Sequence, residues 1–168
     1  MIAVGTGTSG DFDAIEGFAE AAMGPAFDHP NLDGAQRAEN VRIIGMIRQA
    51  CASALDREDA TQLVAHDKAT RPVGFAIVLH TDPPMPEIDW LIEDPSFHGR
   101  GTAGALMRAA LDWIGPGVPM KLGVFHYSAR AIAFYEKHGF RDTGRIVGRD
   151  AIPRRLMIRP AEDGSRHA

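Results

Sequence analysis

The stretch EIDWLIEDPSFHGRGTAG, which runs from Glu87 to Gly104, decides the fold of this chain. Its first part, Glu87–Ile92, is rich in branched and aromatic residues and predicts a strand. Asp94-Pro95 ends that strand, because proline cannot donate to a ladder and restricts the residue before it. Glycines follow, and then apolar residues at helical spacing as far as Ile114. A strand, a glycine turn and a helix N-terminus predict a phosphate site, because the first helical N–H groups are unpaired and glycines let an anion approach them.

The composition indicates one globular domain. The chain has 168 residues, of which 45% are hydrophobic and 24% are charged, and its net charge is −4. We expect a single domain over residues 1–160 and a frayed tail over residues 161–168. The mild acidity offers no basic face for nucleic acid, and no apolar run is long enough to cross a membrane. The single cysteine, Cys51, excludes an intramolecular disulfide and a multi-cysteine zinc site, and it fits a reducing, cytoplasmic setting.

Hydrophobic periodicity places further elements around the central unit. A first helix stops at Gly24-Pro25, and a longer helix spans Ala35–Leu55 with Val41 and Cys51 on its buried face. Another helix, over Ser128–His138, closes at a glycine. Further strands are predicted at Met1–Thr8, Thr61–His66, Val73–Leu79, Met120–His126 and Arg154–Ile158, with one more that begins at Phe140. A short turn joins two of the early strands, so the sheet is expected to be mixed rather than purely parallel.

The glycines also satisfy a dinucleotide-binding pattern. Gly99, Gly101 and Gly104 fit G-x-G-x-x-G. That fingerprint further needs an acidic residue at the end of the next strand, about 20 residues on, to bind the ribose hydroxyls. The next strand reads LGVFH and carries no acid, and the Gly-Lys-Ser/Thr of a nucleotide-binding P-loop is missing as well. An NAD(P)-binding oxidoreductase is therefore only a distant alternative.

Two short motifs lie on either side of a predicted strand. His98–Ala103 reads HGRGTA and Ser128–Phe140 reads SARAIAFYEKHGF. They resemble the pyrophosphate loop Gln/Arg-x-x-Gly-x-Gly/Ala and the Asn-x-x-Ala-x-x-x-Tyr-x-x-x-Gly-Phe motif of the GNAT superfamily of acyl-CoA-dependent N-acyltransferases. His98 and Ser128 replace the usual first residues, and the resemblance covers about Val73–Phe140. It implies an α/β (α+β) fold with a mixed, mostly antiparallel sheet of six to seven strands, flanked by about four helices.

The resemblance implies that acetyl-CoA is the cosubstrate and that a primary amine attacks it directly in a ternary complex. It implies no covalent enzyme intermediate and no metal. The glycine loop and Arg100 would bind the pyrophosphate, and the end of the central strand would pair with the pantetheine, with an N–H near Leu91 facing the thioester oxygen. The expected cofactor-binding residues are Leu91, Ile92, Glu93, His98, Gly99, Arg100, Gly101, Thr102, Ala103, Gly104, Ser128 and Tyr135.

The reaction would also need a base and an acid. A lysine-type amine has a pKa near ~10.4, so it must lose a proton before it attacks. Glu87 is the first candidate base, because glutamate near this position recurs in the family; Asp89 and His126 are the alternatives. Strand alternation places Glu87, Asp89 and Leu91 on one side and the residues between them on the other. Tyr135 is expected to protonate the departing thiolate, because in the family pattern its helix faces the cofactor's sulfur.

A function from another class stays open. A non-catalytic acyl-CoA-binding regulatory domain would keep the anion-binding loop and lack turnover, and the presence of both Glu87 and Tyr135 favours an enzyme. The acceptor would be a small-molecule or peptide amine, and a polyamine, an aminoglycoside, an amino-acid-like toxin and a protein N-terminus all remain candidates. No nucleic-acid or membrane partner is expected, and a homodimer remains open.

Overall fold

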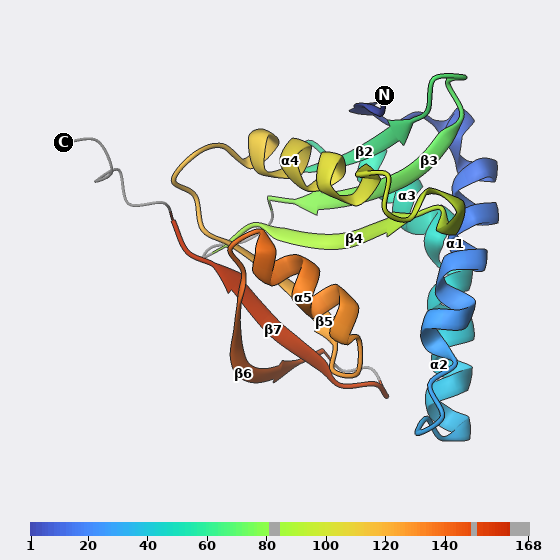
Figure 1. Cartoon of the computed structure of the whole chain (residues 1–168), viewed down its shortest axis with the longest axis vertical. Coiled ribbons are helices and arrows are strands. Elements are labelled where there is room, and N and C mark those ends of the chain that lie inside the picture. The colour runs from blue at the N-terminus through green and yellow to red at the C-terminus, as the bar shows by residue number, and fades with distance from the viewer. Residues whose placement is uncertain (81–84, 149–150, 162–168) are drawn as a thin grey trace.

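A seven-stranded sheet forms the centre of the molecule. The structure is a computed structural model that describes residues 1–80, 85–148 and 151–161, without the side chains of residues 26 and 27. The strands are β1 (Ala3–Thr6), β2 (Ala60–His66), β3 (Pro72–Leu79), β4 (Glu87–Glu93), β5 (Met120–Phe125), β6 (Arg141–Val147) and β7 (Arg154–Arg159). Their order is β1-β2-β3-β4-β5-β7-β6 (Figure 1), and of these neighbouring pairs only β4 and β5 are parallel. The predicted fold class is confirmed.

Helices cover both faces of this sheet. They are α1 (Phe12–Phe27), α2 (Gly34–Gly45), α3 (Ile47–Leu55), α4 (Thr102–Ile114) and α5 (Ala129–Lys137). Apolar residues of α4 and α5 pack on one face, and those of α1 and α3 pack on the other. Cys51 is fully buried in the second of these clusters, as its place on an apolar stripe predicts, and burial raises the pKa of its thiol to about 12.

Strand β4 has two irregularities that shape its surroundings. Its pairing with β3 shifts between Ile77 and Val78, which are opposite Trp90 and Ile88, so Asp89 is an extra residue in a bulge. Its parallel pairing with β5 consists of only two residue pairs, Glu87 with Lys121 and Ile88 with Leu122. Beyond Ile88 the two strands separate, and the rest of β4 is paired only with β3.

The predicted long helix over Ala35–Leu55 is wrong in its continuity. The chain forms α2 and α3, which meet at Met46, where φ is −90° and ψ is −5°. Val41, predicted to be buried, is 71% exposed. The physical reason is that α2 packs against α1 and α3 rather than on the sheet, so the apolar stripe of α3 does not continue into α2.

Other boundaries differ less. Helix α1 continues through Gly24-Pro25 to Phe27, because proline has a helical φ and the hydrogen bond that it removes lies in the last turn. The hairpin of β2 and β3 is confirmed. Residues 162–168 of the predicted tail lie outside the described residues. Within the described part of the chain, none of the helices has the length and apolar character that a membrane span requires.

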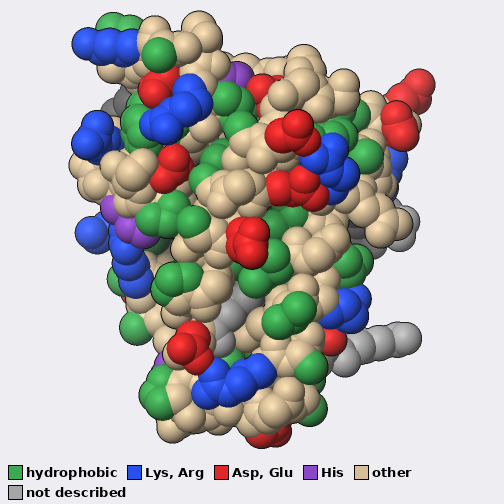
Figure 2. Space-filling view, turned by 90° about the vertical axis from the view of Figure 1, so that its right-hand side faces the viewer, with side chains coloured by type: hydrophobic (Ala, Val, Ile, Leu, Met, Phe, Trp, Pro, Cys, Tyr) green, Lys and Arg blue, Asp and Glu red, His purple; other side chains and the backbone are tan. Residues whose placement is uncertain are grey.

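The face that carries α1 and α2 has no concentrated charge of one sign. These helices form the right-hand side of Figure 1 and face the viewer in Figure 2. Basic and acidic side chains are interspersed there with apolar ones (Figure 2). A nucleic-acid-binding face would gather lysine and arginine into a patch, and this face does not.

Candidate active site

The site begins where β4 leaves β5. The N–H of Asp94 donates to the carbonyl of Val73 at 2.9 Å, so Asp94 is turned toward β3. In an antiparallel pair, alternate residues direct their backbone groups to the same neighbour, so Ile92 is also turned toward β3. Leu91 and Glu93 therefore direct their N–H and C=O groups to the side that β5 has left. The backbone groups of Leu91 and Glu93 have the orientation that pairing with a pantetheine arm requires. Those of Ile92 do not, because they face β3.

The glycine loop after β4 forms an anion cradle. Gly99 and Gly101 have φ values of +76° and +85°, a left-handed conformation that glycine adopts without strain. Helix α4 begins at Thr102, and the N–H of Ala105 is the first that bonds back to the carbonyl of Gly101, at 2.9 Å. The earlier N–H groups of Thr102–Gly104 have no carbonyl within the helix to bond. Thr102 is fully buried, so the accessible backbone of this first turn belongs to the residues after it.

Three side chains gather at the N-terminus of α4. The Glu93 carboxylate accepts a hydrogen bond from the N–H of Ala103 at 3.2 Å. It also lies 3.7 Å from His98 Nε2 and 3.9 Å from a guanidinium nitrogen of Arg130 in α5. Arg130 in turn lies 3.2 Å from His98 Nδ1. The cradle thus holds one carboxylate of the protein, with a guanidinium and an imidazole beside it.

Further positive charge lies next to this loop. The Arg100 guanidinium is 5.0 Å from the centre of the Phe97 ring, and that of Arg71 is 5.3 Å from the same centre. Both arrangements are cation–π contacts, which orient a guanidinium without neutralising it. Arg71, Arg100 and Arg130 therefore surround the loop with three cations, of which only Arg100 was expected from the sequence.

The bulge in β4 changes which residues share a face. Glu87 is paired with Leu79, whose side chain packs in the α1/α3 cluster, and Asp89 lines a pocket against α3. These two carboxylates share a face, as alternation predicts. The expectation for Leu91 is wrong, because Leu91 packs in the cluster under α4 while Trp90 packs with α1 and α3. The extra residue in the bulge reverses the alternation beyond Asp89.

The two carboxylates differ in their electrostatic surroundings. Glu87 Oε2 lies 3.7 Å from the Nζ of Lys121, its partner on β5. Asp89 sits at the edge of a concavity, where loss of hydration and then the nearby Glu87 raise the pKa of its carboxyl group. A raised pKa brings a carboxylate closer to the range in which it accepts a proton at neutral pH.

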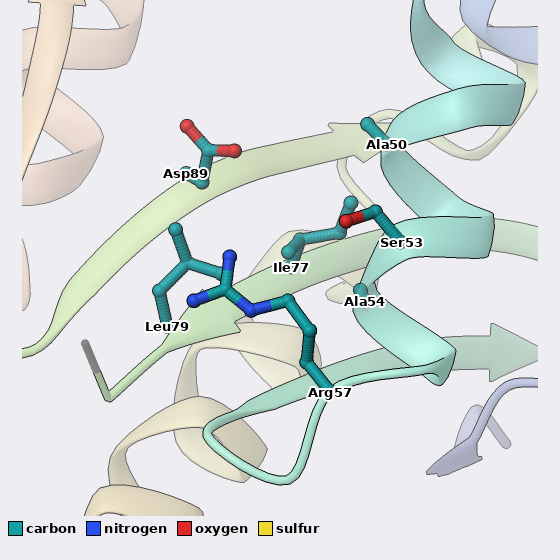
Figure 3. Close-up of a pocket in the computed structure, with 7 residues that line it drawn as sticks. All are labelled: Ala50, Ser53, Ala54, Arg57, Ile77, Leu79 and Asp89. Atoms are coloured by element: carbon teal, nitrogen blue, oxygen red, sulfur yellow. The ribbon is translucent and has the colours of Figure 1, made fainter.

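Asp89 opens into a small pocket with a cavity volume of about 90 Å³ (Figure 3). Its lining comes from three elements: Ala50, Ser53 and Ala54 of α3 with Arg57 just after it, Ile77 and Leu79 of β3, and Asp89 of β4. The lining is apolar except for one acid, one base and one hydroxyl. Such a mixture is typical of small-molecule sites, in which a few polar groups orient a ligand against apolar walls.

His126 lies away from these carboxylates. It is five residues beyond Lys121, or roughly 16 Å along the strand direction at ~3.3 Å per residue. Its Nδ1 lies 3.2 Å from the carbonyl oxygen of Pro153. The register therefore separates His126 from Glu87, whereas Asp89, level with Gly123 in the parallel pair, is about 10 Å away along the strand. Among the residues that the structure describes, no three His, Cys, Asp or Glu side chains form a group that could hold a metal ion.

Tyr135 lies in α5, on the same face of the sheet as α4. Its ring contacts those of Phe134 and Phe140 edge-on, with centroids 5.4 Å and 5.9 Å away. Burial raises the pKa of its phenol to about 12. Ser128 precedes α5 and accepts the N–H of Ile132 with its backbone carbonyl at 3.0 Å, while its hydroxyl caps nothing.

The connection between α1 and α2 reaches the far end of β5. There the His29 ring stacks on Tyr127, with centroids 4.8 Å apart, and Phe125 stacks on Tyr127 at 5.7 Å. Burial raises the pKa of the Tyr127 phenol. These aromatic rings lie on the face of the sheet that carries Glu87 and Asp89.

A match to a known family decides the assignment. Residues 58–142, half of the chain, match the family described as the acetyltransferase (GNAT) domain. The chain belongs to the GNAT family of acetyltransferases. The matched segment contains β2 to β5, the anion cradle, α4 and α5. It therefore includes both short motifs, His98–Ala103 and Ser128–Phe140, that resemble the family.

Individual GNAT relatives agree with this assignment. An uncharacterised N-acetyltransferase of Mycobacterium bovis is 37% identical over 78 residues, which are 44% of this chain and 49% of that protein. A protein of Mycobacterium tuberculosis H37Rv matches to the same extent. The chain thus spans about half the length of the curated relatives it matches.

Solved GNAT structures share the fold over nearly the whole chain. The PaiA N-acetyltransferase of Thermoplasma acidophilum, solved with coenzyme A, superposes with a TM-score of 0.72 at 14% identity, covering 95% of this chain and 99% of that one. The ribosomal-protein-S18-alanine N-acetyltransferase of Escherichia coli superposes with a TM-score of 0.66 at 17% identity, covering 100% and 99%.

Proposed function

We propose that this protein transfers the acetyl group of acetyl-CoA to a primary amine by direct attack in a ternary complex. One observation carries the proposal: β4 is open on its β5 side and then runs directly into the anion cradle. A cosubstrate with an amide-rich arm and an anionic end needs both features in this order. When bound, acetyl-CoA supplies an acyl group activated as a thioester.

Different groups of the chain bind different parts of acetyl-CoA. The N–H group of Gly104, the N–H group of Ala103 once it is released from Glu93, and the side chains of Arg100 and Arg130 bind the pyrophosphate. The backbone groups of Leu91 and Glu93 pair with the amides of the pantetheine arm. The Leu91 N–H then donates to the thioester oxygen, where negative charge develops during the attack. Ser128 stays a predicted contact to the cofactor, because its hydroxyl is not used by the helix.

A carboxylate on β4 removes the amine's proton. Glu87 is the residue predicted from the sequence, and its Oε2 lies 3.7 Å from the Nζ of Lys121. Asp89 is exposed and lines the pocket next to β5, where a substrate amine can reach it, and desolvation raises the pKa of its carboxyl group above the ordinary value for aspartate. We therefore assign the base to Asp89, with Glu87 beside it attracting the substrate ammonium. The distance of His126 from both argues against a direct role for its ring.

Tyr135 assists the leaving group. A phenol whose pKa is about 12 keeps its proton throughout the neutral range and can donate a hydrogen bond to the sulfur. In the balanced step, the amine nitrogen forms the amide bond as the carbon–sulfur bond breaks. Asp89 takes one proton of the substrate ammonium before the attack, and the sulfur leaves with the bonding electrons of the carbon–sulfur bond. Tyr135 donates its proton to the sulfur, which ends as a thiol, and regains one from the second proton that the nitrogen loses as it becomes an amide.

The test combines binding with turnover. Acetyl-CoA should raise the melting temperature, because a ligand that binds only the folded state stabilises it, and NADH should not. CoA release is then measured with a broad panel of primary amines. Stabilisation by NADH alone would contradict the assignment. Binding of acetyl-CoA without CoA release from any amine would favour the non-catalytic regulatory domain.

A further inference from the structure

The pocket beside Asp89 combines opposite charges in a small apolar space. Its cavity volume is about 90 Å³, which is small for a ligand site, so it suits only a very small molecule. Asp89 supplies a negative group and Arg57 a positive one, and Ile77 and Leu79 form an apolar floor between them (Figure 3). No hydrogen bond or ion pair joins Arg57 to Asp89 within the described part of the chain. A ligand can therefore lie between the two charges.

Arg57 is held in a fixed orientation by a residue outside the pocket. Its Nε donates to Asp59 Oδ1 at 2.8 Å and one terminal nitrogen donates to Asp59 Oδ2 at 2.9 Å. This two-bond arrangement occupies one edge of the guanidinium and leaves the other terminal nitrogen for a ligand. Figure 3 shows the guanidinium lying over Leu79, with its terminal nitrogens directed away from the Arg57 main chain. The free edge is thus preorganised.

The pocket is continuous with the proposed reaction site. Asp89 belongs to both, since it lines the pocket and lies in the bulge just after the last β4–β5 pair. A substrate amine at Asp89 would have the rest of its body in the pocket.

We propose that this pocket is the acceptor subsite and that it selects a small zwitterion: a primary amine joined by a short, mostly apolar body to a carboxylate. The amine lies at Asp89. The carboxylate accepts hydrogen bonds from the free edge of Arg57 and from the Ser53 hydroxyl. The apolar body lies against Ile77 and Leu79. This inference rests on the proposed acetyltransferase function and specifies the substrate class of the same site.

The charge arrangement separates this class from two others. A polyamine would bring a second ammonium to Arg57, where like charges repel each other. A neutral alkylamine would leave the free guanidinium edge without a partner after its water is displaced, which costs binding free energy. A carboxylate at the far end of the acceptor satisfies that edge.

Matched acceptors test the proposal. CoA release is measured with leucine, 4-aminobutyrate and 6-aminohexanoate, each against its own carboxamide, which keeps the shape and removes the charge. The three acids vary the distance between amine and carboxylate. We expect at least one acid to exceed its carboxamide in kcat/KM by on the order of 10- to 100-fold, the worth of a charge-assisted hydrogen bond.

Two variants assign that preference to Arg57. In Arg57→Ala the KM for the preferred acid should rise on the order of 10- to 100-fold, about as much as the preference itself, while the KM for its carboxamide, whose neutral oxygen accepts only a weaker hydrogen bond, should rise much less. Arg57→Lys keeps a charge and loses the planar fork, so it should keep part of the preference. Arg141→Ala, which removes an exposed arginine from the edge strand β6, is the matched control and should leave both acceptors unaffected.

The outcomes distinguish a failure of the zwitterion assignment from a failure of the acetyltransferase function. Turnover of carboxamides and plain amines without any preference for acids would overturn the zwitterion assignment and leave the acetyltransferase intact. An equal loss on acid and carboxamide in Arg57→Ala, in a variant whose melting temperature is unchanged, would also overturn it. CoA release from no amine of any kind would contradict the acetyltransferase function itself.

Discussion

The carboxylate of Glu93 accepts a hydrogen bond from the backbone N–H of Ala103, with 3.2 Å between Oε2 and the nitrogen. Glu93 ends β4 and Ala103 lies in the first turn of α4, so this bond joins the two elements that form the anion cradle. A negative group is favourable at this end of a helix. A pyrophosphate that binds there has to displace a negative group of the protein itself.

Glu93→Gln should therefore bind acetyl-CoA more tightly. The neutral amide removes the competing charge and leaves Arg130 and His98 to the cofactor. A charge at a helix N-terminus is worth about 1 kcal/mol, which corresponds to roughly fivefold in affinity. Isothermal titration with acetyl-CoA measures the change, and Glu20→Gln on the exposed side of α1 is the control. Equal or weaker binding in Glu93→Gln would show that the carboxylate supports the cofactor rather than competing with it.

Gly101→Asp should abolish acetyl-CoA binding while the protein still folds. The residue has a φ of +85°, so any side chain there costs roughly 1 kcal/mol of stability, and a carboxylate also repels the pyrophosphate. Titration calorimetry measures binding, and circular dichroism checks the fold. Gly17→Ala, at an exposed helical position with open space around it, should leave the affinity unchanged. Unchanged affinity in Gly101→Asp would mean that the loop only connects β4 to α4.

Asp89→Asn should change the pH dependence of kcat/KM. In the wild type the rate rises as Asp89 ionises, at a pH above the ordinary range for aspartate because its pKa is raised. Without this base the rate should fall by roughly 100-fold near neutral pH and recover at high pH, where the amine loses its proton unaided. Glu87→Gln should mainly raise the acceptor KM. The reverse pattern would make Glu87 the base, as first predicted from the sequence.

The same substitution should change stability in one direction. A carboxyl group whose pKa is higher in the folded state than in the unfolded state binds more protons when folded, so its contribution to stability is present at low pH and is lost as the pH rises through the folded-state pKa. Asp89→Asn should therefore raise the melting temperature above that pH and have little effect below the ordinary aspartate pKa. A lower melting temperature at neutral pH would contradict the raised pKa.

Tyr135→Phe should lower kcat with nearly unchanged acetyl-CoA affinity. The ring contacts with Phe134 and Phe140 survive the loss of the hydroxyl, so folding should be retained. One positioned proton donor is worth about 10²- to 10⁴-fold in rate. Because the pKa of Tyr135 is about 12, the wild-type rate should show no alkaline decline from this residue below about pH 10. If Tyr135→Phe kept full kcat, Tyr135 would not be the proton donor, and water would protonate the departing thiolate.

The central unit of the fold could be predicted because its signals are local. Proline at position 95 and glycines at 99 and 101 are needed for reasons of backbone geometry that act within a few residues. The same holds for Gly139, whose φ of +87° closes α5 where the sequence predicts the end of a helix. Local chemistry of this kind can be read without knowing the tertiary structure.

The rest depends on contacts between distant segments. The bulge at Asp89 arises from pairing with β3, so alternation along β4 alone places Leu91 on the wrong face. The position of Arg130 beside Glu93 depends on how α5 docks next to α4. The orientation of Arg57 depends on Asp59, a surface pair that no periodicity distinguishes from other exposed charges. The hydrogen bond of the Glu93 side chain to the helix N-terminus was not predicted, because the family pattern assigns a role only to the Glu93 backbone.

The two-pair ladder between β4 and β5 gives this sheet a third open border, inside the molecule, besides the outer ones at β1 and β6. Unpaired strand borders are templates on which another chain can add a strand, and proteins usually shield them. Here the cosubstrate itself would cover the border, because its amides pair with the backbone N–H and C=O groups of Leu91 and Glu93. Acetyl-CoA binding would then also protect the protein from self-association, and removal of acetyl-CoA would leave this border open to pairing with a strand of another chain.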